Sequence, residues 1–411
     1  MATQIDHRAV KTPASPDRHA VLACWASAIG FGVEGFDLLI LVFLLAPISV
    51  SFGLSTTRAA SLMTGTLLGA VIGGIGFGLL SDYFGRVRVL TWTIVVFGIF
   101  TGLCAVSRGY WDLLIFRSFA GLGFGGEFGV GLALVAETWP AELRARASSY
   151  VALGGQAGIL AAALSAPILL PRIGWRGMFL IGVVPVLLSF GLRRILPEPE
   201  VFVQAQLQGH KTSPIALLFK DRATRLISLG MLILCSVQQI GYYGLMTWLP
   251  YYLTTRHGLT LTKSALWTSL TVIGMSCGIW LFGQLADRFG RRPSFFIFQA
   301  CAAVMVIAYS RLESPLSLLI GGAVMGMFVN GMLGGYGTLI SELYPTEARA
   351  TAQNLFFNVG RALGGFGPLL IGFFANKYSF ATAIALLASL YVIDLFATAF
   401  LIPESKGVLL T

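Results

Sequence analysis

Long apolar segments, separated by short clusters of charged residues, recur along the whole of this 411-residue chain. A membrane-spanning helix needs about 20 mostly apolar residues, and twelve segments approach or exceed that length. We predict spans at residues 21–48, 58–80, 88–106, 111–137, 146–169, 176–195, 225–253, 263–285, 294–310, 315–341, 351–375 and 380–402. The pattern therefore predicts an all-α membrane protein with twelve transmembrane helices.

Composition supports a lipid-facing surface. Only 11% of the residues are charged and 56% are hydrophobic, whereas a soluble protein usually carries about 25% charged residues. The net charge of +10 comes from clusters between apolar runs, so we expect a lipid bilayer and no nucleic acid as partner. The five cysteines lie inside apolar segments without metal-ligand spacing, so we expect no disulfide, metal or cofactor.

The longest polar stretch inside the chain divides the spans six and six. We expect a flexible cytoplasmic tail at 1–20, an N-terminal half at 21–196, a central cytoplasmic loop at 197–222, a C-terminal half at 223–403 and a cytoplasmic tail at 404–411. Of the 28 Lys and Arg residues, 18 fall on the side of the termini and 8 on the other. This excess places both termini in the cytoplasm, under a cell (inner) membrane.

An internal repeat relates the two halves. Gly78-Leu-Leu-Ser-Asp82-Tyr-Phe-Gly85-Arg86 recurs as Gly283-Gln-Leu-Ala-Asp287-Arg-Phe-Gly290-Arg291. Glu137-Thr-Trp-Pro140-Ala-Glu142-Leu-Arg144 recurs as Glu342-Leu-Tyr-Pro345-Thr-Glu347-Ala-Arg349, at the same offset of 205 residues. Because each copy holds an even number of spans, the repeats are parallel, and a central site between the halves is expected.

These motifs also carry a family resemblance. The doubled G-x-L-x-D-x-x-G-R loop resembles the signature of the major facilitator superfamily, and the run from Arg117 to Gly123 resembles its second motif. Glu34-Gly-Phe-Asp37 is similar to the acidic signature of organic-acid/proton symporters, whereas the run from Gly125 to Gly131 resembles the sialate/lactate group more than the aromatic-acid group. The ending Pro403-Glu404-Ser405-Lys406-Gly407 is similar to that of sugar porters. The resemblance implies the major facilitator fold and leaves the substrate branch open.

Charged residues at the cytoplasmic span ends are candidates for a gate. Asp82 and Arg86, like Asp287 and Arg291, are four residues apart and can share a helix face or close a turn. A carboxylate there is favoured by the N-terminus of a neighbouring helix. The resemblance implies a cytoplasmic latch that favours the outward-open state; solvated loop charges are the alternative. We expect the rest of the network to consist of Glu137 with Arg144 and Glu342 with Arg349.

Two acids on the first span are candidates for proton coupling. A charged residue at mid-membrane costs about 2.5–3.5 kcal/mol, so it normally faces a cavity and has a partner. Glu34 and Asp37 are three residues apart on one helix face. When two carboxylates lie this close together, the charge on one raises the pKa of the other. One of them can therefore hold a proton near neutral pH. The alternative for Asp37 is a structural pair with an arginine.

The fourth span carries Arg117 and Glu127, about 15 Å apart at 1.5 Å per residue. Arg117 is expected to govern the proton acceptor, and the alternative is an ion pair that pins helices together. Glu127 is equally a coupling residue or a structural one.

Arg361 in the eleventh span is the candidate for anion binding. It has no acid within one helical turn, and a guanidinium suits bidentate capture of a carboxylate. The alternative is a salt bridge to an acid on another span, such as Asp394. By the repeat offset Gln156 is its counterpart, and Tyr242 that of Asp37. The predicted substrate-binding set is Arg361, Asn358, Gln156, Tyr242 and Gln239.

Charge balance leads to a function. Inside the predicted spans lie four acids, Glu34, Asp37, Glu127 and Asp394, and two bases, Arg117 and Arg361. If all are ionised the interior carries an excess of negative charge, so an incoming anion requires a proton. We predict a monomeric, non-enzymatic secondary transporter that takes up a small organic anion, foremost a monocarboxylate, with protons. Proton-antiport efflux of drugs or metabolites, a sugar or aromatic-acid symporter, and a transport-dead receptor are the alternatives.

Overall fold

The computed structural model describes residues 15–207, 212–257, 261–408 and 410, and within these ranges every regular element is a helix. The N-terminal half contains α1 (Arg18–Phe52), α2 (Thr56–Phe84), α3 (Arg86–Cys104), α4 (Tyr110–Gly125), α5 (Glu127–Thr138), η1 (Ala141–Leu143) and α6 (Arg144–Arg193). The C-terminal half contains α9 (Arg222–His257), α10 (Leu261–Phe289), α11 (Arg291–Tyr309), α12 (Pro315–Gly331), α13 (Leu333–Leu343), η2 (Thr346–Ala348), α14 (Arg349–Gly364), α15 (Gly367–Lys377) and α16 (Phe380–Leu401).

Eleven helical runs of the described chain are long and apolar enough to cross a membrane. One of them includes most of α6, whose 50 residues would extend about 75 Å as a straight helix. Gly174 interrupts it with a φ of 67°. Arg144 and Arg193, at the two ends of α6, lie at the same end of the bundle, near Glu342 and the first turns of α3. The element therefore supplies two crossings, and the twelve-helix prediction is confirmed.

Three predicted spans each consist of two helices in line. The fourth divides into α4 and α5 at Gly126, the tenth into α12 and α13 at Met332, and the eleventh into α14 and α15 at Gly365. Gly126 and Met332 are themselves in the right-handed helical region, so these breaks are local changes of direction.

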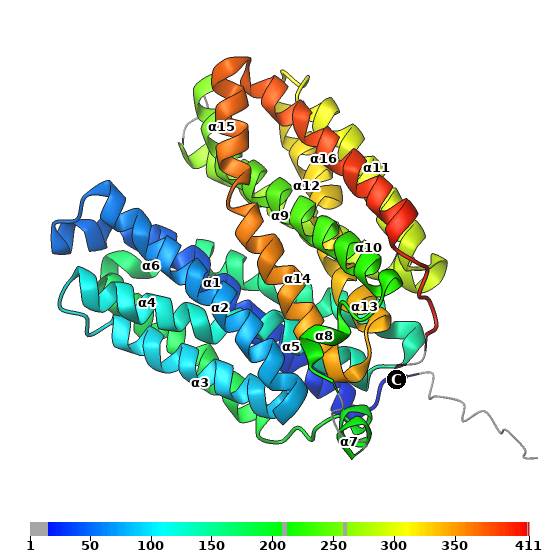
Figure 1. Ribbon diagram of the computed structural model, residues 1–411. Coiled ribbons are helices and arrows are strands. Elements are labelled where there is room, and N and C mark those ends of the chain that lie inside the picture. The colour runs from blue at the N-terminus through cyan, green and yellow to red at the C-terminus, as the bar shows by residue number, and fades with distance from the viewer. Residues whose placement is uncertain (1–14, 208–211, 258–260, 409, 411) are drawn as a thin grey trace, which may run out of the picture.

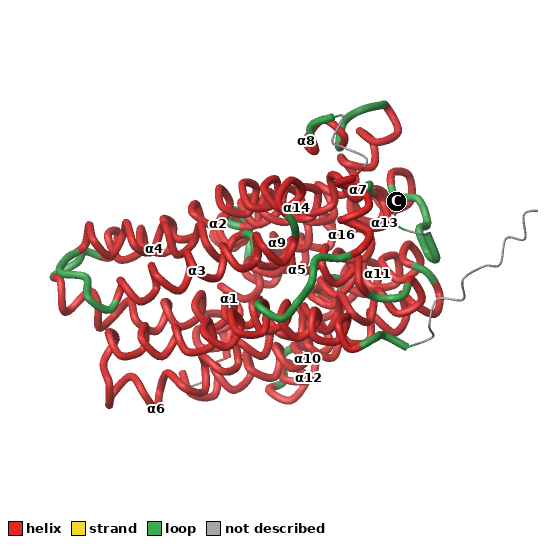
Figure 2. Tube along the Cα trace, turned by 90° about the horizontal axis from the view of Figure 1, so that it is seen from below, coloured by secondary structure: helices red, strands yellow, loops and turns green. Residues whose placement is uncertain are grey.

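The predicted polar segments are partly helical. The side chain of Asp17 accepts a hydrogen bond from Ala20 N and caps α1, so the helix begins inside the predicted tail; residues 1–14 lie outside the described residues. Two short helices, α7 (Glu200–Leu207) and α8 (Pro214–Leu217), occupy much of the predicted central loop. They contact η2 at the margin of the bundle, and Figure 2 shows α8 at its upper edge.

Each copy of the repeated loop turns at a glycine. Gly85 and Gly290 have φ values of 110° and 111°, a region that side chains with a Cβ rarely adopt. The carboxylate of Glu198 then accepts the backbone N–H groups of Arg86 and Arg88 at the start of α3. The turn and this cap bring the charged ends of neighbouring helices together.

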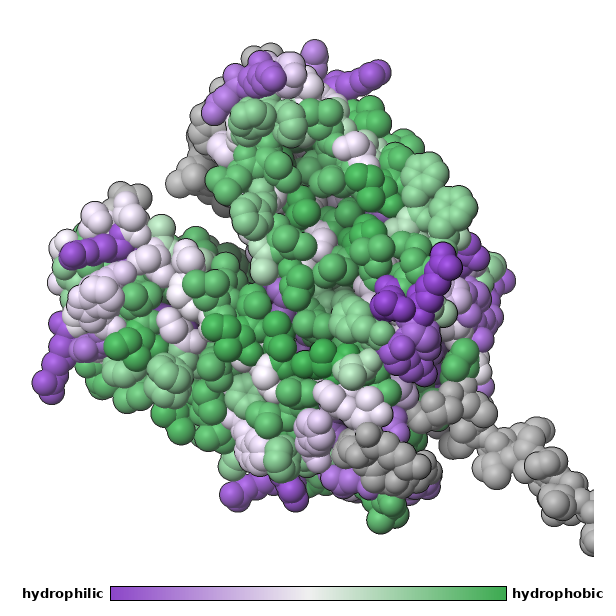
Figure 3. Space-filling view, viewed as in Figure 1, coloured by the Kyte–Doolittle hydropathy of each residue, from purple (hydrophilic) through white to green (hydrophobic). Residues whose placement is uncertain are grey.

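The two halves meet along α2, α5, α6, α10, α13 and α14. Figure 1 shows them joined at the end that carries α7, α8 and the C-terminus, and splayed apart at the other end. We call these ends the closed side and the open side. In Figure 3 the surface is hollowed between the halves on the open side, and the outer faces are largely hydrophobic, as a lipid-facing surface requires.

Candidate functional site

A cavity lies between the two halves and is lined by both. Its empty volume is about 470 Å³, including open solvent at the mouth. The walls come from α1, α6, α9, α12, α13 and α14. This is the position expected for the substrate site of a transporter with two parallel repeats.

One ion pair crosses the cavity from half to half. Nη2 of Arg361, on α14, donates to Oε1 of Glu34, on α1, and both side chains are at most 5% exposed. The guanidinium also lies over the ring of Phe357, with 4.9 Å from its central carbon to the ring centroid. The partner of Arg361 is therefore Glu34, whereas Asp394 makes no contact with it.

The pair is incompletely satisfied. Within the described chain, Nε and Nη1 of Arg361 and Oε2 of Glu34 have no hydrogen-bond partner, and neither does Oε1 of Gln156 nearby. Buried polar groups normally find partners, so a row of unpaired donors and acceptors in a cavity suits a polar ligand. Phe31, Leu38 and Phe357 provide apolar wall beside them, and this combination suits a ligand with a charged head and an apolar body.

The cavity contains most of the residues predicted to bind substrate. Gln156, Gln239 and Tyr242 line it together with Arg361. Asn358 does not: its Nδ2 donates to the carbonyl groups of Gly125 and Asn354, between helices of opposite halves. Tyr243, next to Tyr242, also lines the cavity. Two polar lining residues were not predicted, Gln238 and Asn330: Gln238 is next to Gln239, and Asn330 is on a span without a charge at mid-membrane.

The other predicted coupling residues lie in the N-terminal half, outside the cavity lining. Arg117 donates from Nη1 and Nη2 to the two oxygens of Asp37, at 2.9 and 2.6 Å. Glu127 is paired with Arg193 at 2.5 Å, and Arg193 is 1% exposed. The sequence pattern had placed Arg193 among the cytoplasmic bases; the structure instead makes it a third base of the interior.

Comparison with known proteins decides the family. The model of the Major Facilitator Superfamily matches residues 27–310 and 258–409. A Haemophilus influenzae protein named for metabolite transport is 60% identical over 388 residues, 93% of this chain and 95% of its own length. The chain belongs to the major facilitator superfamily. The cis,cis-muconate transport protein of Acinetobacter baylyi is 31% identical, over 88% of this chain and 89% of its own length.

Solved structures show the same fold. The proton:xylose symporter XylE superposes with a TM-score of 0.80 at 19% identity, over 95% of this chain and 98% of the XylE chain. With the family model and the 60% identical relative, the chain is a transporter of the major facilitator superfamily, a multi-pass membrane protein and not an enzyme. Several more distant relatives are also named for the transport of organic acids.

In this major facilitator protein the repeated motifs form two networks on the closed side. Arg86 binds Asp82 at 2.8 Å and Glu137 at 2.9 Å. Glu137 also binds Arg349 of the C-terminal half at 2.7 Å. The carboxylate of Asp82 accepts hydrogen bonds from the N–H groups of Ala350 and Thr351 in the first turn of α14. The N-terminus of a helix favours negative charge at this position.

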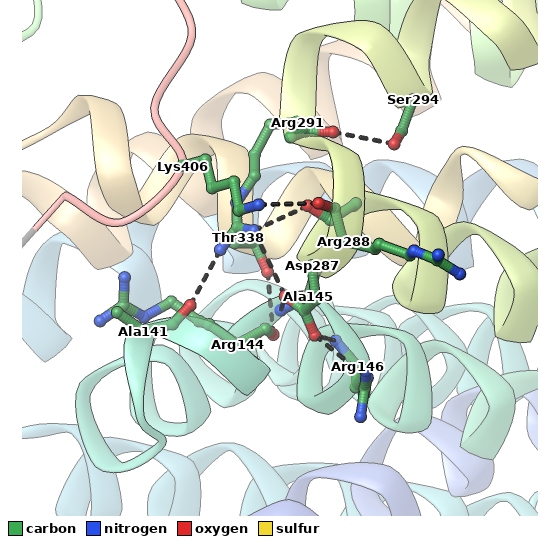
Figure 4. A network of polar contacts seen from close by, with 12 residues as sticks. Ala141, Arg144, Ala145, Arg146, Asp287, Arg288, Arg291, Ser294, Thr338 and Lys406 are labelled. Atoms are coloured by element: carbon green, nitrogen blue, oxygen red, sulfur yellow. Dashed lines mark hydrogen bonds and ion pairs between the residues drawn. The ribbon is translucent and has the colours of Figure 1, made fainter. Parts of the chain in front are cut away.

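The second copy repeats this geometry in the opposite direction. Asp287, at the end of α10, accepts the N–H groups of Ala145 and Arg146 in the first turn of α6, as Figure 4 shows. Arg291 binds Glu342 at 2.7 Å, and Glu342 also binds Arg144 at 3.0 Å. Both networks therefore connect the two halves.

Glu137 and Glu342 pair with other arginines than those predicted. The sequence suggested Glu137 with Arg144 and Glu342 with Arg349, whereas the structure pairs Glu137 with Arg349 and Glu342 with Arg144. The physical reason is that equivalent helix ends of the two halves face each other on the closed side. Each acid therefore reaches the arginine of the opposite half, and each pair holds the halves together.

Proposed function

We propose that this transporter takes up a small organic anion, foremost a monocarboxylate, together with protons, by alternating access. The observation that carries the proposal is the Arg361–Glu34 pair in the central cavity. A guanidinium binds a planar carboxylate through two parallel hydrogen bonds, and two nitrogens of Arg361 have no partner among the described residues.

Glu34 couples the anion to a proton. While Glu34 is ionised, it competes with an incoming carboxylate for Arg361, and the anion would add an uncompensated charge to a buried site. Protonation of Glu34 removes the competitor and keeps the cavity neutral once the anion binds. Among the predicted coupling residues, Glu34 is the one that lines the cavity, whereas Asp37 is held by two nitrogens of Arg117.

The two networks on the closed side act as a latch. They connect the halves through Glu137–Arg349 and Glu342–Arg144, and release of these pairs would let the halves separate there. The excess of basic residues around the termini and the central segment assigns the closed side to the cytoplasm. The conformation described is then the one open to the outside.

Purified transporter in vesicles tests this function. Labelled lactate, benzoate, nicotinate and muconate would be offered with and without an imposed gradient, acidic outside. We expect accumulation of at least one acid that requires the gradient and is lost in Arg361→Lys, while Arg311→Lys, an exposed control, transports normally. Transport of organic cations in exchange for protons, indifferent to Arg361, would refute symport in favour of efflux.

The aromatic wall supports a second candidate, an aromatic or other planar acid. Phe31 and Phe357 line the cavity, and both contact Phe128. The ring centroid of Phe128 is 4.3 Å from that of Phe31 and 4.2 Å from that of Phe357. Flat rings favour an unsaturated ligand in offset or edge-on contact. Faster uptake of benzoate or muconate than of lactate would select this candidate.

A further inference from the structure

One buried acid differs from all the others. Eight acidic residues of the described chain are buried, and seven have an arginine partner: Glu34, Asp37, Asp82, Glu127, Glu137, Asp287 and Glu342. The eighth, Asp394 on α16, is 0% exposed. Neither of its oxygens has a hydrogen-bond partner among the described residues.

The groups around Asp394 are uncharged or weakly acidic. Cys235 on α9, Tyr336 on α13 and Tyr391 one turn earlier on α16 are within electrostatic range, and Gln299 on α11 faces it. The hydroxyl of Tyr336 already donates to Leu234 O. The helix α15 also packs on α16, and its charged residue, Lys377, is at its far end.

The position that holds Arg193 in the first half falls one turn after Asp394 in the second half. The N-terminal half holds the Glu127–Arg193 pair between α5 and α6. At the offset of 205 residues the C-terminal half has Met332 and Thr398 in place of these two charges. The arginine that neutralises a buried acid in the first half is therefore a threonine in the second.

The charge count of the interior points to the same residue. Arg193 joins Arg117 and Arg361 as a third interior base, so three acids of the interior are paired and Asp394 is left over. An ionised carboxylate without a partner costs several kcal/mol inside a membrane protein. A proton on Asp394 removes that cost.

We propose that Asp394 is a second proton-binding site of the transport cycle, located in the C-terminal half and separate from the Arg361–Glu34 pair. The proton comes from water in the cavity, forms an O–H bond on a carboxylate oxygen, and returns to water at the closed side. This proposal rests on the proposed symport. With one proton on Glu34 and one on Asp394, each monovalent anion enters with a net charge of +1.

Polar groups extend from Asp394 toward both sides. Toward the cavity, the hydroxyl of Tyr391 lies beside Gly241 of α9 and has no partner in the described chain. Gln238, one turn before Gly241 on α9, lines the cavity together with Asn330. Toward the closed side, Gln299 donates to Thr398 Oγ1 at 2.8 Å, and the partly exposed Arg292 donates to Thr398 O at 3.2 Å. The proposed route of the proton uses these groups on each side.

Two measurements test the site. Infrared spectroscopy of purified protein should show a protonated-carboxyl band that disappears in Asp394→Asn and persists in the exposed control Glu313→Gln. In vesicles, the monocarboxylate of the panel with the fastest uptake should accumulate about 100-fold per pH unit in the wild type and about 10-fold in Asp394→Asn. An imposed membrane potential should drive the wild type and not the variant.

Several results would overturn the proposal. An infrared band unchanged by Asp394→Asn would show that this carboxyl carries no proton, and wild-type potential dependence in the variant would show that its proton stays fixed. If the variant does not fold, electroneutral uptake by the wild type overturns the proposal by itself. If no acid of the panel shows pH-driven uptake while the infrared band of Asp394 is present, the proposed symport is refuted, and this proposal is refuted with it.

Discussion

The exchange of Arg361 for lysine tests the central site most directly. Lysine keeps the positive charge, so long-range attraction for an anion is retained. The change removes the planar arrangement of three nitrogens, of which Nη2 binds Glu34 and the other two have no partner in the described chain. It also removes the flat group that lies over Phe357.

The expected magnitude follows from the number of donors lost. A lysine has a single nitrogen that must serve Glu34 or the substrate, so at least one hydrogen bond between charged groups is lost from the complex. Such a bond contributes about 1.5–3 kcal/mol, which corresponds to about 10- to 150-fold in dissociation constant. The loss should be smaller when Glu34→Gln is combined with Arg361→Lys, because the competitor for the single nitrogen is then neutral.

Calorimetric binding of the panel acid to purified protein measures this effect without requiring transport. Arg311→Lys provides the matched control at an exposed position, and thermal unfolding shows whether each variant is folded. Binding by Arg361→Lys within about threefold of the wild type, less than 1 kcal/mol, would show that the guanidinium does not hold the substrate.

Three further changes test the coupling and the latch. Asp82→Asn and Asp287→Asn should each slow uptake with little change in affinity, because each acid holds a helix N-terminus of the opposite half; wild-type rates in vesicles would remove the latch. Glu34→Gln should retain substrate exchange but lose pH-driven accumulation, because the anion requires a protonated Glu34. For the same reason, the wild type should bind substrate more tightly as the pH falls. Accumulation by the variant would place the proton elsewhere. Asp37→Asn should lower stability by about 3–5 kcal/mol, because it leaves Arg117 buried without its carboxylate, and Arg117→Gln should restore much of it; a stable but uncoupled variant would make Asp37 the proton carrier.

Much of this protein can be predicted from local sequence. The length of each apolar run determines whether it can cross a bilayer, and the fixed offset between two motifs identifies the duplication. Candidate charged residues are also recognisable, because a charge within an apolar span is costly and therefore functional or paired. This reasoning predicts Glu34 and Arg361, and the repeat offset predicts Gln156; all three line the cavity.

The identity of each partner was decided only by the tertiary structure. Helical periodicity defines which residues share a face, but it does not define how one helix is rotated against another. Arg361 and Glu34 are 327 residues apart, and Glu137 reaches Arg349 rather than Arg144 only because the two halves close against each other. Arg193 was read as a loop base from its position near a span end, whereas the packing of α6 turns it inward to Glu127. The same packing leaves Asp394 without a cation, and the position that holds Arg193 in the first half is Thr398 in the second.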